Sequence, residues 1–179
     1  MRSNIFEKVD LAIEALRNAP QRSTLSPAVS NADLAQMNNL LTEAQLPQMP
    51  PDVMYFLSKV GACTGPYCDI HGIEGLHGAR DADDVSVISC SRYLNRDEED
   101  LEDKGLVIGH IQKNGMLRHD IVYKNEKYYL VEDERGAHNY FLEPGNFGDV
   151  ILHAIKWGEQ RKRDDELQKM RNEVEKWSD

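Results

Sequence analysis

The sequence is poor in cysteine and has no long apolar run, and both shortages exclude classes of protein. Its three cysteines, Cys63, Cys68 and Cys90, are an odd and sparse set in 179 residues. Such a set suits reduced thiols in a cytosol better than a disulfide framework. The sequence lacks any run of about 18 apolar residues, which excludes a transmembrane helix, and its first residues lack the apolar core of a secretory signal. We therefore expect a cytoplasmic protein that does not bind membranes.

Motifs of common catalytic and phosphate-binding sites are also missing. The sequence has no G-x-S-x-G elbow and no G-x-x-x-x-G-K-S/T loop. Gly72, Gly75 and Gly78 recur every three residues, which indicates a turn-rich exit from a strand rather than a phosphate cradle. His119-Asp120 resembles the paired ligands of metal phosphohydrolases, but in a predicted strand these two side chains point to opposite faces. We predict a protein that is not an enzyme and binds no cofactor.

One cluster consists of residue types that bind metals. Cys63, Cys68, His71 and His77 follow the spacing C-x4-C-x2-H-x5-H. Structural zinc sites usually contain a tight C-x2-C pair, which this cluster lacks. Buried small thiols are therefore the favoured interpretation, and a bound metal is the alternative. A thiol enzyme or hydrolase would need a pocket that brings a cysteine, a histidine and a carboxylate together.

Negative charge is the most pronounced feature of the composition. The sequence has 31 acidic and 21 basic residues, which gives a net charge of -10. A negative field repels phosphate backbones, so direct nucleic-acid binding is disfavoured, and it speeds the encounter with a basic partner. Much of the excess lies in one segment, which contains Asp97, Glu98, Glu99, Asp100, Glu102 and Asp103. This segment is either a solvated loop or a docking surface for a cationic protein.

Apolar residues at helical spacing predict three helices in the first third of the chain. The first covers residues 4–18, and the second begins at Ser30 or Asn31, either of which can cap it. The third begins at Pro50-Pro51-Asp52, because proline suits a first turn and an aspartate suits the positive end of the helix dipole. Gly61 is expected to end it in the left-handed conformation. The predicted buried faces are Phe6, Val9, Ile13 and Leu16; Leu34, Met37 and Leu41; and Val53, Phe56, Leu57 and Val60.

Beyond this third helix the pattern changes toward strands. A short strand is expected over residues 67–73, whereas residues 81–96 fit either state and favour a helix because acids precede them. From Gly105 the apolar period is two, and Asn114-Gly115 is a strong signal for a type I′ hairpin turn. Leu106-Val107-Ile108 is expected to begin the first of these strands, and further strands are predicted over residues 117–123, 127–131 and 138–142. A second turn is predicted at Lys124-Asn125-Glu126.

A long C-terminal helix is predicted over residues 147–177, after a break at Pro144-Gly145-Asn146. Its first part suits packing on a sheet, and beyond Gly158 it is highly charged. The apolar residues of the two parts are Val150, Ile151, Ala154 and Ile155, and then Leu167, Met170, Val174 and Trp177. We expect the second part to pack against the N-terminal helix. A coiled-coil dimer seam and a partner-binding tail are the alternatives.

Several of these segments together resemble the SUKH superfamily, whose founding members include a yeast cell-wall synthesis regulator. They are LPQMPPDVMYFL, a following glycine, an I-x-G-I strand, L-V-I-G before a hairpin, K-Y-Y-L-V, and a terminal helix after N-F-G-D. The matching positions are Leu46, Pro47, Tyr55, Phe56, Leu57, Gly61, Ile70, Gly72, Ile73, Leu106 to Gly109, Tyr128 to Val131 and Phe147 to Ile155. Two features depart from the family: Val60-Gly61 replaces its usual asparagine-glycine, and the tail after Gly158 has no counterpart.

The resemblance implies an α+β fold in which helices pack against one side of a mainly antiparallel sheet. Bacterial proteins of this kind are similar to immunity proteins, which neutralise polymorphic toxins, often nucleases or deaminases, by binding them. The family has no shared catalytic residues, so the resemblance implies none here. A nuclease toxin is basic, and the acidic composition of this chain is consistent with such a partner.

These observations predict three parts and one leading function. The parts are an N-terminal helix and connector (residues 1–30), a SUKH-like domain (31–156) and a charged helical extension (157–179). We expect the chain to bind a basic toxin domain through the acids between Asp97 and Asp103. The alternative is a cytosolic regulatory or scaffold module that dimerises through the C-terminal helix or recruits partners, without a toxin.

Overall fold

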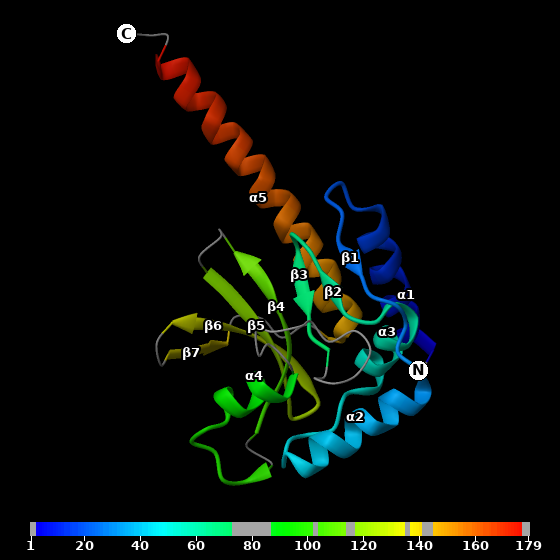
Figure 1. Cartoon of the computed structure of the whole chain (residues 1–179). Coiled ribbons are helices and arrows are strands. Elements are labelled where there is room, and N and C mark those ends of the chain that lie inside the picture. The colour runs from blue at the N-terminus through cyan, green and yellow to red at the C-terminus, as the bar shows by residue number, and fades with distance from the viewer. Residues whose placement is uncertain are drawn as a thin grey trace.

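The fold combines one antiparallel sheet with five helices among the residues that the structure describes (Figure 1). The structure is a computed structural model, and it describes residues 3–72, 87–101, 104–113, 117–134, 137–140 and 145–176. The α+β class, the antiparallel sheet and the long C-terminal helix are confirmed. Within the described ranges, none of the helices combines the length and the apolar composition that crossing a lipid bilayer requires.

The first three helices, α1 (Ser3–Asn18), α2 (Asn31–Glu43) and α3 (Pro51–Val60), lie where the sequence predicts them. Ser30 caps α2, because its hydroxyl accepts a hydrogen bond from the backbone N–H of Asp33. Gly61 ends α3 with φ 61° and ψ -152°. The predicted positive φ is confirmed, although the ψ lies outside the left-handed helical region. A Cβ at this position would lie 2.2 Å from the carbonyl oxygen of Pro27. Glycine is therefore required both for the positive φ and for lack of space.

Seven strands follow one another across the described sheet in chain order. They are β1 (Thr24–Leu25), β2 (Cys63–Thr64), β3 (Cys68–Ile70), β4 (Leu106–Lys113), β5 (Leu117–Lys124), β6 (Lys127–Glu134) and β7 (Ala137–Tyr140). The sequence did not predict β1 and β2, and β3 is shorter than the predicted strand. The predicted Asn114-Gly115 turn lies outside the described residues. The next turn has the type I′ geometry, with positive φ at Asn125 (51°) and Glu126 (60°).

Helices cover both faces of the sheet, which corrects the prediction that they pack on one side. The long helix α5 (Phe147–Lys176) packs on the face that carries Ile111, Ile121 and Leu130, together with α1 and α3. The helix predicted near residues 81–96 is present as α4 (Val87–Leu94) and packs on the opposite face. There, Cys90 and Leu94 lie against a smaller cluster of Val107, Val122 and Val131. Because successive side chains of a strand point to opposite faces of the sheet, these three valines lie on the face away from α5, and α4 shields them from solvent.

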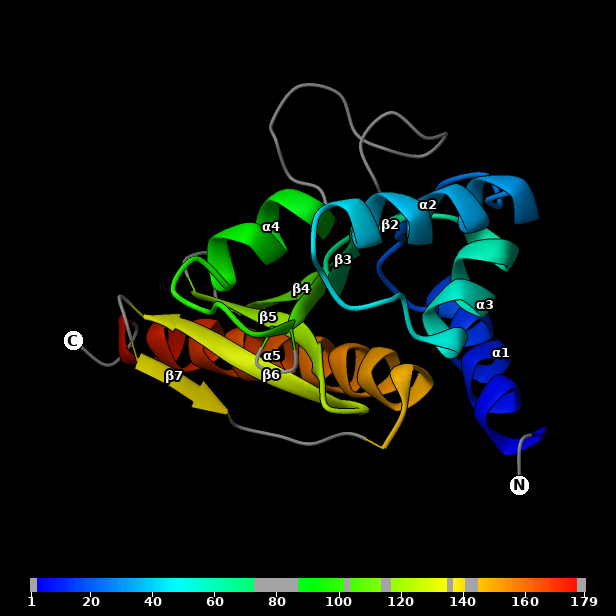
Figure 2. The ribbon, with the colours of Figure 1, turned by 90° about the horizontal axis from the view of Figure 1, so that it is seen from below.

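The main core joins the N-terminal helix to the rest of the fold. Val9, Ala12 and Ile13 of α1 are buried in the same cluster as the apolar residues of α3 and α5. Figure 2 shows α1 beside α3 at one end of the sheet. Of the predicted stripe on α1, only Phe6 is partly exposed, at 36%.

The second half of α5 leaves the body of the molecule, which corrects the expectation that it packs against α1. Lys8 of α1 contacts the first turn of α5, where it binds Asp149 and its backbone lies against Gly148. All side chains from residue 162 to residue 173 are exposed, including Leu167 (54%) and Met170 (61%). The helix therefore projects from the domain (Figure 1). The side chains of Val174 and Trp177, the other members of the predicted apolar stripe, lie outside the described residues.

Candidate functional site

The acidic segment lies in a loop whose two ends are fastened to the fold by one buried asparagine. Asn95 follows α4 and is 7% exposed. Its side-chain amide donates to the carbonyl oxygens of Ser91 and Gly105, both at 2.6 Å, and its oxygen accepts from the N–H of Gly105 at 2.7 Å. Asn95 thus ties Gly105 to the end of α4, at the base of the segment that carries the acids 97–100.

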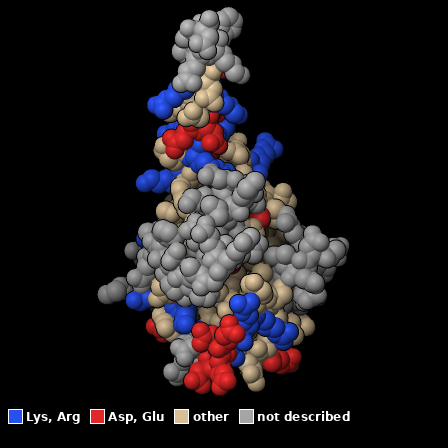
Figure 3. All heavy atoms as spheres, turned by 90° about the vertical axis from the view of Figure 1, so that its left-hand side faces the viewer, with Lys and Arg blue, Asp and Glu red and all other residues tan. Residues whose placement is uncertain are grey.

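The acids of this loop face solvent. Residues 97–100, which are four of the six predicted docking acids, are exposed, and Glu102 and Asp103 lie outside the described residues. Asp97 lies 3.2 Å from the Nε of Arg96, with exposed side-chain fractions of 85% and 63%. Such an exposed pair contributes little to stability. Acidic side chains gather at the lower end of the face in Figure 3, where α4 and the loop after it lie in Figure 1. A partner can reach them there.

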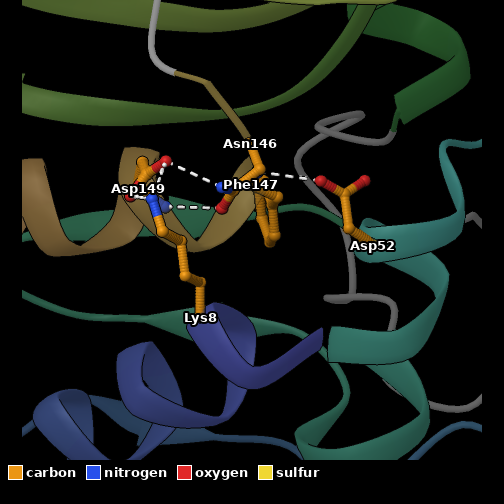
Figure 4. Close-up of polar contacts among 5 residues, drawn as sticks. All are labelled: Lys8, Asp52, Asn146, Phe147 and Asp149. Carbon is orange, nitrogen blue, oxygen red and sulfur yellow. Dashed lines mark hydrogen bonds and ion pairs between the residues drawn. The ribbon is translucent and has the colours of Figure 1, made fainter. Parts of the chain in front are cut away.

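The N-terminus of α5 is held by polar contacts from three elements (Figure 4). Asn146 accepts a hydrogen bond from the N–H of Asp149 at 3.0 Å and donates its side-chain amide to the Asp149 carboxylate at 2.7 Å. Lys8 of α1 binds the same carboxylate at 2.8 and 2.9 Å. Asp52 of α3 accepts the N–H of Phe147 at 2.9 Å. Two carboxylates therefore satisfy the positive end of this helix.

Asp52 is the buried centre of that arrangement. It is 6% exposed and also accepts hydrogen bonds from the hydroxyl of Tyr128 and, at 3.1 Å, from the N–H of Val53. Burial and the nearby Asp52 carboxylate raise the pKa of Tyr128 far above its ordinary value, so this phenol remains a donor. The sequence indicated Asp52 as a residue for the dipole of its own helix. Its contact with α5, 95 residues further on, had no signal in the sequence.

A cavity of about 460 Å³ lies beside this buried centre. It is formed by the start of α1, the start of α3, the turn between β5 and β6, and the residues before α5. The side chains that give it its character are Phe6, Pro50, Asp52, Tyr123, Glu126 and Tyr128. Within the described part of the chain, no lysine or arginine lines it. The cavity is therefore apolar and aromatic, with negative charge and no positive charge.

The predicted cluster of cysteines and histidines is not assembled as a metal site in the described residues. Cys63 and Cys68 are buried at 1% and 0% exposure, and the thiol of Cys63 points to the carbonyl oxygen of Cys68 at 4.0 Å. The hydrogen bond with Cys63, together with burial, raises the pKa of the Cys68 thiol. His77 lies outside the described residues. Where the chain is described, no group of three or more candidate ligands comes together.

His119 and Asp120 point to opposite faces, as predicted. His119 is 1% exposed and packs its ring on Trp157 of α5, with 5.1 Å between the ring centroids. Asp120 lies on the other face, where it pairs in register with His110 of β4. The two side chains therefore cannot bind one ion together.

Sequence analysis missed a buried imidazole–carboxylate pair on the α4 face. His110 Nε2 lies 3.0 Å from Asp69 Oδ2, and the ring of His71 lies 5.2 Å from that of His110. These residues meet because β3 and β4 pair Asp69 with His110. Among the described residues, the Nδ1 atom of His110 has no hydrogen-bond partner, so no nucleophile is aligned with it there. Within the described ranges, the pair therefore has no third member of a catalytic triad beside it.

No protein-family model matches the chain, and no curated protein is significantly similar to it.

Proposed function

We propose that this chain is a non-enzymatic protein-binding domain of the SUKH type, most simply an immunity protein that neutralises a basic toxin domain by direct binding. The observation that carries the proposal is the acidic loop between Asn95 and Gly105, which is exposed at its tip and fastened at its base. A loop of this kind offers charge to a partner without a large loss of conformational entropy on binding.

The resemblance to the SUKH superfamily supports the proposal from a second direction. Its segments form the parts of the fold that the resemblance implies: Phe56 and Leu57 are buried in α3, and Ile70 lies in a strand. The N-F-G-D segment forms the capped start of α5. The acidic composition is consistent with a nuclease partner, because an enzyme that holds nucleic acid presents positive charge.

Charge reversal with a matched control tests the docking surface. One triple variant replaces Asp97, Glu98 and Glu99 with lysine, and the control replaces the exposed Asp164, Asp165 and Glu166 of α5 with lysine. Both variants change the net charge equally. We expect the loop variant to weaken binding at least tenfold and to reduce its salt dependence, whereas the control retains most of the affinity.

The test requires a toxin domain encoded next to the gene of this chain, which is used as an inactive variant. Its affinity is measured by calorimetry between 50 and 300 mM salt, roughly the range over which charge contacts are screened. Equal affinities for both triple variants would show that the loop is not the docking surface. Failure of the unmodified chain to bind or to protect cells from that toxin would contradict the immunity function itself.

A dimerising regulatory module is the second candidate, and the projecting half of α5 favours it. Leu167 and Met170 are exposed on a helix that has no neighbour in the described chain beyond residue 161. Sedimentation equilibrium of the full chain and of a chain ending at residue 161 distinguishes the candidates. A dimer that becomes a monomer on truncation would support the module, and a monomer in both cases would contradict it.

A further inference from the structure

The cavity at the start of α5 has the surfaces of a pocket for a charged but largely apolar guest. At its rim, Ile5 and Phe6 are 41% and 36% exposed, so both offer apolar surface to a guest. One wall consists of the rings of Tyr123 and Tyr128, whose centroids lie 5.1 Å apart. Concave aromatic and apolar surfaces of this kind are where partner side chains are desolvated in protein interfaces.

The charge in the cavity has one sign. Asp52 lies at its floor and Glu126 at its rim, and no basic residue is found among its described lining residues. Lys8 is near, but its ammonium group is bound by both oxygens of Asp149. Burial, then the charge of Asp52 and then that of Glu126 raise the pKa of the Tyr123 phenol. The cavity therefore disfavours a negative group and favours a positive one.

The backbone at Glu126 is unusual for its residue type. It is the second residue of a type I′ turn and has φ 60°, a conformation in which glycine is the usual choice. The chain has a glutamate there, with its side chain exposed and lining the cavity. Residues with strained backbone conformations concentrate at binding sites, where the function of the side chain outweighs the conformational cost.

We propose that this cavity binds an arginine side chain of the protein partner. The guanidinium group pairs with the Glu126 carboxylate and stacks on the ring of Tyr123, while its methylene groups lie against Phe6. Asp52, whose oxygens are already engaged, contributes its negative field from the floor. The inference rests on the proposed function, because it assumes a basic protein partner, and it adds an anchor point that the acidic loop does not supply.

The first test uses N-acetyl-arginine amide as the probe, titrated into the full chain and followed by amide NMR shifts. We expect saturable shifts in the turn between β5 and β6 and around residues 145–147, with a dissociation constant on the order of 10 mM, typical of one side chain. N-acetyl-citrulline amide, which has nearly the same shape without the charge, should bind at least fivefold more weakly. Equal binding of both probes, or no saturable shifts, would overturn the inference.

Two variants locate the binding. E126Q keeps the size and the backbone conformation of the residue but removes its charge, and we expect the affinity for the arginine probe to fall at least threefold. E99Q, in the acidic loop, removes the same charge elsewhere and should leave the affinity unchanged. Equal losses in both variants would mean that the overall field attracts the probe, and the proposed pocket would be wrong.

The probe experiment is independent of the toxin experiment. If the chain binds a toxin domain but not the arginine probe, the pocket is refuted and the proposed function remains. If the probe binds in the cavity but no toxin is bound, the immunity function fails while the pocket is retained.

Discussion

At the scale of single residues, buried polar side chains hold together parts of the chain that are far apart in sequence. Asp52 links α3 to the first turn of α5 and to Tyr128 of β6. Asn95 closes the acidic loop in the same way. These links could not be predicted, because a polar residue in a sequence does not indicate which distant donor it will meet. The elements on which they lie were largely predictable.

Removal of the Asp52 carboxylate is expected to destabilise the fold strongly. Asp52→Ala leaves the buried N–H of Phe147 and the hydroxyl of Tyr128 without an acceptor, which costs roughly 1–3 kcal/mol for each group. We expect a loss of about 2–6 kcal/mol in the free energy of unfolding, measured by urea denaturation. Tyr128→Phe removes one donor and keeps the carboxylate, so its loss should be about 1 kcal/mol. Equal losses for the two variants would contradict this account.

His153 is expected to make stability depend on pH below neutrality. Burial, and then the charge of Lys156, lower the pKa of this half-buried imidazole in the folded state. The unfolded chain therefore takes up the proton first as the pH falls. The contribution of His153 is complete above the ordinary pKa of about 6.5 and is lost as the pH falls toward the lower folded value.

The measurement compares the unmodified chain with His153→Gln by urea denaturation between about pH 7.5 and pH 5. Groups common to both proteins cancel in the difference. We expect the stability of the unmodified chain minus that of His153→Gln to decrease as the pH falls, because only the unmodified chain loses stability through this side chain. A constant difference over the whole range would show that the His153 pKa is not lowered.

At the scale of elements, local chemistry predicted the helices better than the sheet. The Ser30 cap, the Pro51 start and the Gly61 end each act within a few residues, so they could be read directly. The two-residue strands β1 and β2 depend on pairing between Thr24-Leu25 and Cys63-Thr64, which no local pattern indicates. The side of the sheet that α4 covers also depends on tertiary packing.

The crossing of α1 and α5 depends on a glycine at the contact. A Cβ at Gly148 would lie 2.5 Å from the carbonyl carbon of Lys8 and 2.6 Å from its oxygen, and backbone atoms cannot rotate away. Gly148→Ala should therefore cost about 1–3 kcal/mol despite the better helix propensity of alanine. Gly145→Ala is the matched control, because its Cβ would meet only the end of the Asp149 side chain at 3.3 Å. Thermal unfolding should separate the two variants clearly.

The projecting half of α5 is expected to contribute almost nothing to the stability of the domain. Among the described side chains, a chain ending at residue 161 loses only exposed ones (residues 162–173), so its Tm should stay within about 3 °C of that of the full chain. A chain ending at residue 156 also loses the contact of Trp157 with His119 and that of Glu159 with Tyr67, and should unfold at a much lower temperature. Equal losses in both truncations would show that the tail packs on the body.

At the scale of the whole molecule, the net charge of -10 opposes the compact state. Salt screens this repulsion over about 10 Å at 0.1 M. We expect the Tm to rise by a few degrees between low salt and about 0.2 M sodium chloride. The variant in which lysine replaces Asp97, Glu98 and Glu99 should show a smaller rise in Tm, because its net negative charge is smaller in magnitude. A Tm that falls with added salt would show that attractive ion pairs outweigh the repulsion.

The first helix determines how the protein can be handled in such experiments. Ile5 and Phe6 lie at the rim of the cavity, directly after the first residues that the structure describes. A purification tag or fluorescent fusion placed ahead of them would begin at the mouth of the pocket and could compete with a guest. Attached at the other terminus, beyond the projecting end of α5, the same label would be held away from both the pocket and the acidic loop.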